Sequence, residues 1–365
     1  MWRDRALRNR AVRALLPGAL HTVESTLVDV GQLPAVGVNR ILVLRANHRL
    51  GNAILLTPLI TELERVYPGA EIDIVVGGAA APELLGGFFS VRRIFRLPRY
   101  MVRHPIFMIS TILQLRRARY DLAIDPTEGS NSGRLLLKWM RPHYAVGVPD
   151  LRSASNGGWG SIMLSAPRHM AQLPVFVLRR ALSSEQAAEQ PYPALNVCLT
   201  TDERRAGRRV LSALLPSGDE AEHRIIVGIF ANATGSKCYS ETWWDRFIAA
   251  MGLGHPEYAI VEIVAAHGRS QLGARFPAFY SASPRKMAAV MSNLTCFISA
   301  DCGVMHLGSA SGTPTVGLFS TTDTQKYGPY GQHSQAVDTE GKTPEEIAAV
   351  AIRIIEAVVA TRPST

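Results

Sequence analysis

Short apolar segments alternate with segments of helical spacing along most of this chain, and the alternation occurs twice. In the first half the apolar runs lie at 40–45, 71–77, 91–97, 120–125 and 144–148. After a loose stretch rich in Ser, Asn, Gly and Pro, they return at 223–230, 259–265, 295–300 and 314–319. Strands that alternate with helices form βαβ units and a parallel sheet. The sequence therefore predicts two α/β domains in tandem, with ligands at the carboxyl ends of the strands, in a cleft between the halves.

The helical segments set the limits of the predicted parts. We expect a helix over 53–67, because Pro68 and Gly69 follow it, and a long amphipathic helix over 343–360. Thr343-Pro-Glu-Glu346 opens the second helix as a capping box with proline at the first helical position. The predicted parts are a basic N-terminal extension (1–38), a first domain (39–195), a second domain (196–342) and a C-terminal helix (343–365).

The charge of the chain favours an anionic partner. Its 365 residues have a net charge of +9 and a pI near 9.6, which suits nucleic acid, an anionic membrane or a phosphorylated substrate. Charge alone does not choose among these three. No nucleic-acid recognition motif is present, so we expect no nucleic-acid partner.

Cysteine use and hydropathy favour a cytoplasmic protein. The four cysteines form no CxxC pair, which argues against a zinc site or a disulfide framework. No uncharged apolar run reaches the ~18–20 residues of a membrane-spanning helix. The first twenty residues are interrupted by five arginines, which a signal peptide would exclude from its apolar region. We therefore expect a cytoplasmic location, with a peripheral position on the inner face of the inner membrane as an open alternative.

The most informative local motif follows the apolar run 295–300. Asp301 and Gly303 stand where a buried strand ends and a helix begins, so that backbone N–H groups and the helix dipole make a corner for an anion. Asp301 either caps this helix or accepts from a sugar hydroxyl, and Gly303 lets a ligand approach the backbone. His306 is either a ligand-binding residue or a buried core histidine.

This tract resembles the donor-binding half of the family 9 glycosyltransferases, the ADP-heptose:lipopolysaccharide heptosyltransferases. The family pattern is Asp-Ser/Thr-Gly, then His-Leu, Gly-x-Pro, Phe-Gly-x-Thr and Gly-Pro-x-Gly. The residues that match it are Asp301, Gly303, His306, Gly312, Pro314, Phe319, Thr322, Gly328, Pro329 and Gly331. Cys302 and Ser320 depart mildly from it.

A second match lies in the loop after 223–230. The family places a lysine there, with an aromatic residue two positions later and a tryptophan seven positions later, and Lys237, Tyr239 and Trp244 keep this spacing. A fixed ammonium stabilises the charge that a diphosphate leaving group gains as the glycosidic bond breaks. By this resemblance Thr234, Lys237, Asp301, Gly303, His306 and Thr322 bind the donor.

The third match contains the departure with most consequence for the chemistry. The loop 45–52 precedes Thr57-Pro58-Leu59, where the family reads Gly-Asp and then Thr-Pro-Leu, and its Asp is the expected base for the acceptor hydroxyl. Position 52 is Asn in this chain, and an amide accepts no proton at neutral pH. Asn52 could orient the acceptor while His48, Asp125 or Glu128 takes the proton.

Eight arginines and no acidic residue lie between 91 and 120. Arg92, Arg93 and Arg96 suit an acceptor surface for phosphorylated, lipid-linked sugar, and the apolar run at 105–113 suits a membrane edge. An ordinary buried helix with solvated basic ends explains the same pattern.

The resemblance implies a GT-B type enzyme, with two Rossmann-like domains facing a central cleft, that is inverting, metal-independent and free of cofactors. It would move a sugar, heptose by resemblance, from a nucleotide-sugar donor such as ADP-heptose to an anionic lipid-linked glycan acceptor of the lipopolysaccharide core type. Two alternatives stay open: a catalytically impaired relative that binds a sugar nucleotide, marked by Asn52, and a nucleotide-sugar epimerase on the same fold.

Overall fold

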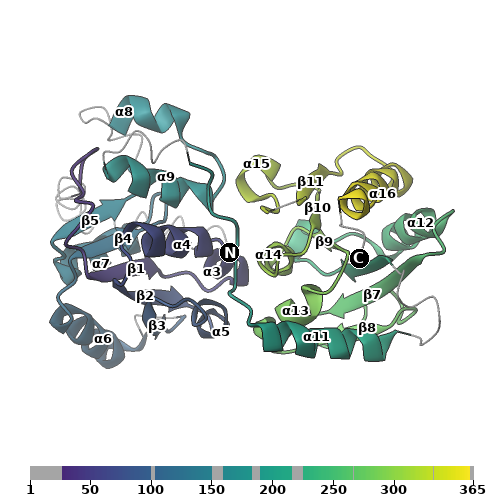
Figure 1. The fold of residues 1–365 in the computed structure, drawn as a ribbon, viewed down its shortest axis with the longest axis horizontal. Helices are drawn as coiled ribbons and strands as arrows, with labels where there is room; N and C mark the ends of the chain where they lie inside the picture. The colour runs from purple at the N-terminus through teal and green to yellow at the C-terminus, as the bar shows by residue number, and fades with distance from the viewer. Residues whose placement is uncertain are drawn as a thin grey trace. The chain divides into compact units, whose positions relative to one another are not determined.

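The computed structural model of the chain describes residues 27–99, 103–149, 159–182, 190–215, 225–265, 267–331 and 333–361. The polypeptide divides into two compact units, the first ending at Pro193 and the second beginning at Ala194 (Figure 1). Most of the expected N-terminal extension, residues 1–26, lies outside the described residues.

The first unit is built on a five-stranded parallel sheet with the order β3-β2-β1-β4-β5. Its strands are β1 (Arg40–Arg45), β2 (Glu71–Gly77), β3 (Val91–Leu97), β4 (Leu122–Asp125) and β5 (Tyr144–Gly147). All but the first residue of β1 and of β2 are buried. Strands covered on both faces read as continuous apolar runs, which is why the sequence predicts them well.

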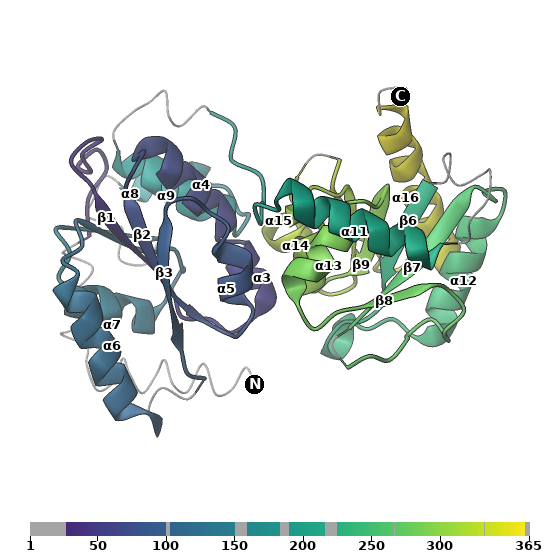
Figure 2. The same cartoon turned by 60° about the horizontal axis from the view of Figure 1, so that its bottom comes forward.

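Helices cover both faces of this sheet. They are α3 (Leu50–Ile54), α4 (Thr57–Val66), α5 (Ala81–Leu85), α6 (Pro105–Arg117), α7 (Asn131–Met140), α8 (Trp159–Ile162) and α9 (Gln172–Ala181). Helices α4 and α9 pack together, as do α6 and α7, and Figure 2 shows the two pairs on opposite sides of the sheet.

The single helix expected over 53–67 is in fact two helices. Helix α3 ends at Ile54, and α4 begins at Thr57 with Pro58 in its first turn. Proline has no N–H to continue the hydrogen-bond ladder, and its ring clashes with the preceding turn. The Thr57 hydroxyl donates to the Ile54 carbonyl at 2.8 Å, which fixes the bend between the two helices.

The second unit contains a six-stranded parallel sheet with the order β11-β10-β9-β6-β7-β8. Its strands are β6 (Ile225–Phe230), β7 (Tyr258–Val264), β8 (Ala278–Tyr280), β9 (Cys296–Ala300), β10 (Thr315–Phe319) and β11 (Gln335–Asp338). Its helices are α11 (Thr201–Leu214), α12 (Glu241–Gly252), α13 (Pro284–Met291), α14 (Gly303–Ala310), α15 (Thr324–Tyr327) and α16 (Pro344–Ala360).

The C-terminal helix α16 packs on α12 and completes the core of the second unit. Its predicted capping box is confirmed: the Thr343 hydroxyl accepts from the Glu346 N–H at 3.3 Å, and the Glu346 carboxylate accepts from the Thr343 N–H at 2.8 Å. Among the described helices none combines the length and apolar character needed to cross a membrane.

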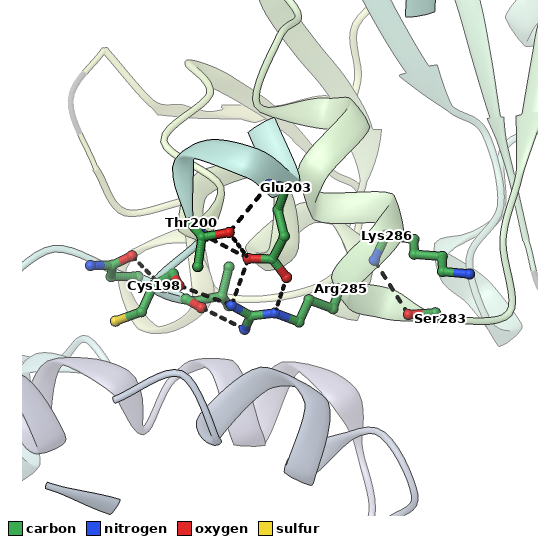
Figure 3. A network of polar contacts seen from close by, with 8 residues as sticks. Cys198, Thr200, Glu203, Ser283, Arg285 and Lys286 are labelled. Atoms are coloured by element: carbon green, nitrogen blue, oxygen red, sulfur yellow. Dashed lines mark hydrogen bonds and ion pairs between the residues drawn. The ribbon is translucent and has the colours of Figure 1, made fainter. Parts of the chain in front are cut away.

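A guanidinium holds the start of the second unit against α13. Arg285 donates to both carboxylate oxygens of Glu203, at 2.5 and 2.9 Å, and to the carbonyls of Val197 and Cys198, at 3.0 and 2.9 Å. Glu203 also closes the cap of α11 by accepting from the Thr200 N–H (Figure 3). One arginine thus joins the incoming chain, the first turn of α11 and the first turn of α13.

Replacing Arg285 by alanine should cost the protein about 2 kcal/mol of stability, because charge-assisted hydrogen bonds in a half-buried site are lost together. For a unit of this size that corresponds to a fall in Tm of about 4–8 °C by calorimetry. Lys286→Ala is the matched control, since the neighbouring lysine is exposed and should change stability by less than about 0.5 kcal/mol. Equal effects of the two substitutions would contradict this assignment.

Candidate functional site

An ion pair joins the two motifs that the sequence predicts to bind the donor. Asp301 follows the end of β9, and Lys237 lies in a short 3-10 helix, Gly235–Lys237, after β6. The Lys237 Nζ lies 2.5 Å from the Asp301 Oδ2. Because β6 and β9 are parallel neighbours, their carboxyl ends lie at one edge of the sheet, and residues distant in sequence meet there.

Asp301 does not cap the helix that follows it. Cys302 holds the N-cap position of α14, whose first residue is Gly303, and the Asp301 carboxylate is only 5% exposed and directed to Lys237. Of the two roles that the sequence left open, the structure therefore removes helix capping. The positive end of the α14 dipole lies beside this carboxylate, in a corner suited to an anionic ligand.

The other predicted donor-side residues surround this pair at different depths. Thr234 is exposed just before the 3-10 helix, Thr322 is half-buried between β10 and α15, and His306 is buried within α14. The Ser320 hydroxyl after β10 reaches the Ser236 carbonyl at 3.4 Å. Loops after three neighbouring strands thus converge at the carboxyl edge of the sheet.

The two aromatic residues of the second motif have different environments. Trp244 is 1% exposed and belongs to the core of the second unit. Tyr239 packs on Trp243 and Trp244, and its hydroxyl shares a 2.8 Å hydrogen bond with the Thr339 hydroxyl. We conclude that the spacing from Lys237 to Trp244 reflects the packing of the loop on α12.

A hollow of about 230 Å³ lies beside this loop. Its lining residues are Ala231, Tyr239, Glu241, Trp244, Ser270, Gln271 and Gly273. The segment 270–273 was not predicted from the sequence, because nothing in its composition marks it as part of a site.

On the first unit, a buried arginine that was not predicted to be a site residue holds the predicted acceptor-side loop. Arg45, at the end of β1, is 4% exposed and donates to the Asn52 Oδ1 and to the Thr127 hydroxyl, both at 3.0 Å. Asn52 in α3 is therefore held by a cation. A carboxylate at this position would form an ion pair, which would lower its pKa and weaken it as a base.

Of the three predicted proton acceptors, Asp125 has the least accessible place. It is fully buried and lies 3.5 Å from the Arg134 guanidinium. A Cβ at position 133 would come within 2.2 Å of the Asp125 carboxylate. Only glycine at this position therefore allows the first turn of α7 to pack over Asp125. Burial, opposed by the charge of Arg134, raises the pKa of Asp125 to about 6. Asp125 therefore lies in the interior of the unit.

His48 and Glu128 are exposed in the loops after β1 and β4. The His48 loop rests on Gly77, where a Cβ would lie 2.8 Å from the Asn47 backbone and the His48 ring. Partial burial and the positive charge of Arg99 lower the pKa of His48. Its imidazole is therefore mainly neutral at pH 7, which is the form that accepts a proton.

The three predicted acceptor arginines lie on the edge strand β3 with different surroundings. Arg92 is paired with Asp73 at 2.8 Å and with Glu71 at 2.6 Å. Arg93 is 3.9 Å from Asp73 and exposed, and Arg96 is exposed. Arg92 thus holds the edge of the sheet, and Arg93 and Arg96 are the two that remain accessible.

In the described part of the chain no group of three or more His, Cys, Asp or Glu residues could hold a metal ion. The chemistry available from these residues is that of ammonium, guanidinium, imidazole and carboxylate groups. Binding of an anion and transfer of a proton are within their reach.

Comparison with protein families and structures gives this geometry a context. The model of glycosyltransferase family 9 (heptosyltransferase) matches residues 283–349. This segment contains Asp301 and the tract to Gly331, and the resemblance drawn from the sequence is confirmed. A comparison with curated proteins finds no match.

Several solved structures share the fold over most of the chain. A glycosyltransferase of family 9 from Veillonella parvula has a TM-score of 0.67 at 17% identity, covering 89% of this chain and 98% of that one. The E. coli ADP-heptose lipopolysaccharide heptosyltransferase II has a TM-score of 0.64 at 16% identity, covering 87% and 99%. The E. coli heptosyltransferase WaaC with ADP has a TM-score of 0.62 at 18% identity, with the same coverage. The predicted GT-B type fold, with two Rossmann-like domains, is confirmed.

Proposed function

We propose that this chain, a glycosyltransferase of the family 9 type, transfers a sugar from a nucleotide-sugar donor to an anionic glycan of the lipopolysaccharide core type. Heptose from ADP-heptose is the donor that the family resemblance favours. The observation that carries the proposal is the Lys237–Asp301 pair at the carboxyl edge of the second sheet. The pair brings together a cation and a hydrogen-bond acceptor, and a sugar diphosphate would use both.

The proposed reaction is a single inverting displacement that needs no metal. The acceptor hydroxyl oxygen bonds to C1 of the sugar from the face opposite the diphosphate. The bond from C1 to the diphosphate oxygen breaks, and its electron pair stays on the nucleoside diphosphate. The Lys237 ammonium stabilises this growing charge, while Asp301 accepts from a hydroxyl of the sugar.

The hydroxyl proton requires a base other than Asn52. His48 is our candidate, because it is exposed and mainly neutral at pH 7, and Asn52, held by Arg45, orients the acceptor. Loss of transfer in His48→Gln at unchanged donor affinity would support this role. Unchanged transfer would move the role to Glu128.

We further propose that the enzyme works in the cytoplasm at the inner face of the inner membrane, where lipid-linked acceptors are exposed. The positive charge of the chain and the accessible Arg93 and Arg96 support an acceptor that carries phosphate.

Release of nucleotide from a panel of sugar nucleotides, with and without a lipopolysaccharide inner-core acceptor, tests the proposal. We expect acceptor-dependent release by the unmodified enzyme and a change of less than about tenfold in Asn52→Asp, because Arg45 would pair with the new carboxylate. Donor binding without release, restored by Asn52→Asp, would identify an impaired relative. Conversion of the donor alone to an isomer would identify an epimerase.

A further inference from the structure

Helix α6 carries apolar side chains on two opposite sides. Its inward stripe packs on the core of the first unit through Met108, Ile112 and Leu115. Its outward stripe consists of Ile106, Ile109 and Leu113, which are 83%, 59% and 48% exposed. The spacing of the second stripe places its members on one side of the helix, opposite the first. The helix is thus packed on the sheet by one side, as the sequence allowed, and carries a second apolar stripe that the core does not cover.

Arginines lie at both ends of the outward stripe. Arg103 precedes the helix, and Arg116 and Arg117 form its last turn; all three are exposed. No Asp or Glu occurs between residues 91 and 120. The exposed side of α6 is therefore an apolar strip in positive surroundings.

This arrangement is unusual for a helix that faces water. The outward side of a surface helix is normally polar, and a contiguous apolar strip in the open marks an interaction site. An apolar face with basic residues beside it is the pattern of helices that lie in the plane of a membrane surface.

We propose that α6 docks on an anionic lipid bilayer. In this arrangement Ile106, Ile109 and Leu113 enter the boundary between headgroups and acyl chains, and Arg103, Arg116 and Arg117 contact lipid phosphates. This inference rests on the proposed function in one respect, namely that the glycan acceptor is bound to a membrane. It adds that α6 is the element that contacts the membrane.

Charge complementarity selects this partner over two others. Nucleic acid would pair with the arginines but offers no apolar layer for the stripe. A second copy of the chain packed on the same face would bring arginines against arginines. An anionic membrane supplies a negative layer and an apolar layer at adjacent depths.

Sedimentation of the full chain with vesicles tests the proposal. We expect the protein to bind vesicles of phosphatidylcholine with phosphatidylglycerol, to bind pure phosphatidylcholine weakly, and to lose binding as salt rises. The double variant Ile109→Glu/Leu113→Glu should bind the anionic vesicles at least about tenfold more weakly. Leu253→Glu, at an 80% exposed leucine of the second unit, should bind like the unmodified protein.

Three results would overturn the assignment. Undiminished vesicle binding by the double variant would place the contact elsewhere, for example in the basic N-terminal segment. Equal binding to neutral and to anionic vesicles would show that charge does not contribute to the contact. Dimers that the double variant abolishes, without vesicle binding, would identify a second copy as the partner. Since the assay uses no donor, and nucleotide release can be measured with a soluble acceptor, failure here is distinct from failure of the proposed transferase activity.

Discussion

Lys237→Ala is expected to lower kcat for acceptor-dependent nucleotide release by about 10²–10³-fold, equivalent to about 3–4 kcal/mol of transition-state stabilisation. The ammonium is fixed 2.5 Å from Asp301, so it is in place before the leaving diphosphate gains charge. A preorganised charge of this kind contributes most in the transition state, and the effect on KM should be smaller than the effect on kcat.

Two comparisons separate this chemistry from a loss of folding. Lys286→Ala, at an exposed lysine of the same unit, should leave kcat unchanged. Asp301→Asn should also lower activity, and the double variant should lose less than the product of the two single losses, because the pair acts together. A Lys237→Ala enzyme with a nearly unchanged kcat would show that the Lys237–Asp301 pair does not support the proposed function.

Most strands could be predicted from the sequence, including the edge strands β3 and β5, but the short strands β8 and β11 at the edges of the second sheet could not. Strands β1, β2, β9 and β10 are covered on both faces and read as apolar runs. The edge strand β8 has three residues, none of them buried, and β11 has one buried residue of four. Short, half-exposed strands lack the apolar pattern from which a strand is recognised.

The residues of the candidate site could be predicted where they belong to a sequence motif. They could not be predicted where they depend on contacts between elements that lie far apart in the sequence. The motifs pointed to Lys237 and Asp301, but their contact depends on β6 and β9 being neighbours, which no local pattern specifies. The burial of Asp125 beside Arg134 and the hydrogen bond from Arg45 to Asn52 likewise arise from tertiary packing. As a result, the predicted base Asp125 lies in the interior, and Asn52 is held by the Arg45 guanidinium.

A second large effect is expected away from either site, at a buried ion pair of the first unit. Glu62 of α4 and Arg179 of α9 are 0% and 2% exposed, and the guanidinium donates to both carboxylate oxygens, at 2.8 and 3.1 Å. Arg179 also donates to the carbonyls of Gln190 and Pro191, at 2.5 and 3.1 Å. The pair therefore holds the last residues of the unit against α4 and α9.

Arg179→Ala should destabilise the protein by about 3–5 kcal/mol, because it leaves the Glu62 carboxylate buried without its main partner. Calorimetry should show a fall in Tm of about 6–20 °C for a unit of this size. Arg65→Ala is the matched control, since Arg65 contacts the same carboxylate at 2.6 Å from a side chain that is 44% exposed. It should cost less than about 1 kcal/mol.

The pH dependence of this loss tests its cause. Burial alone would raise the pKa of Glu62, but hydrogen bonds from Arg179 and Arg65 outweigh it and lower the pKa. In the unmodified protein the pair therefore adds stability above the unfolded pKa of about 4.3, and this stability is lost as the pH falls through the lower folded pKa. Without Arg179, burial dominates and the pKa of Glu62 in the folded state rises. Protonation of Glu62 at lower pH then removes the buried charge and reduces the destabilisation of the variant. The Tm difference should consequently narrow as the pH falls from about 7 to about 5, and a constant difference would assign the loss to packing and to the two carbonyl bonds instead.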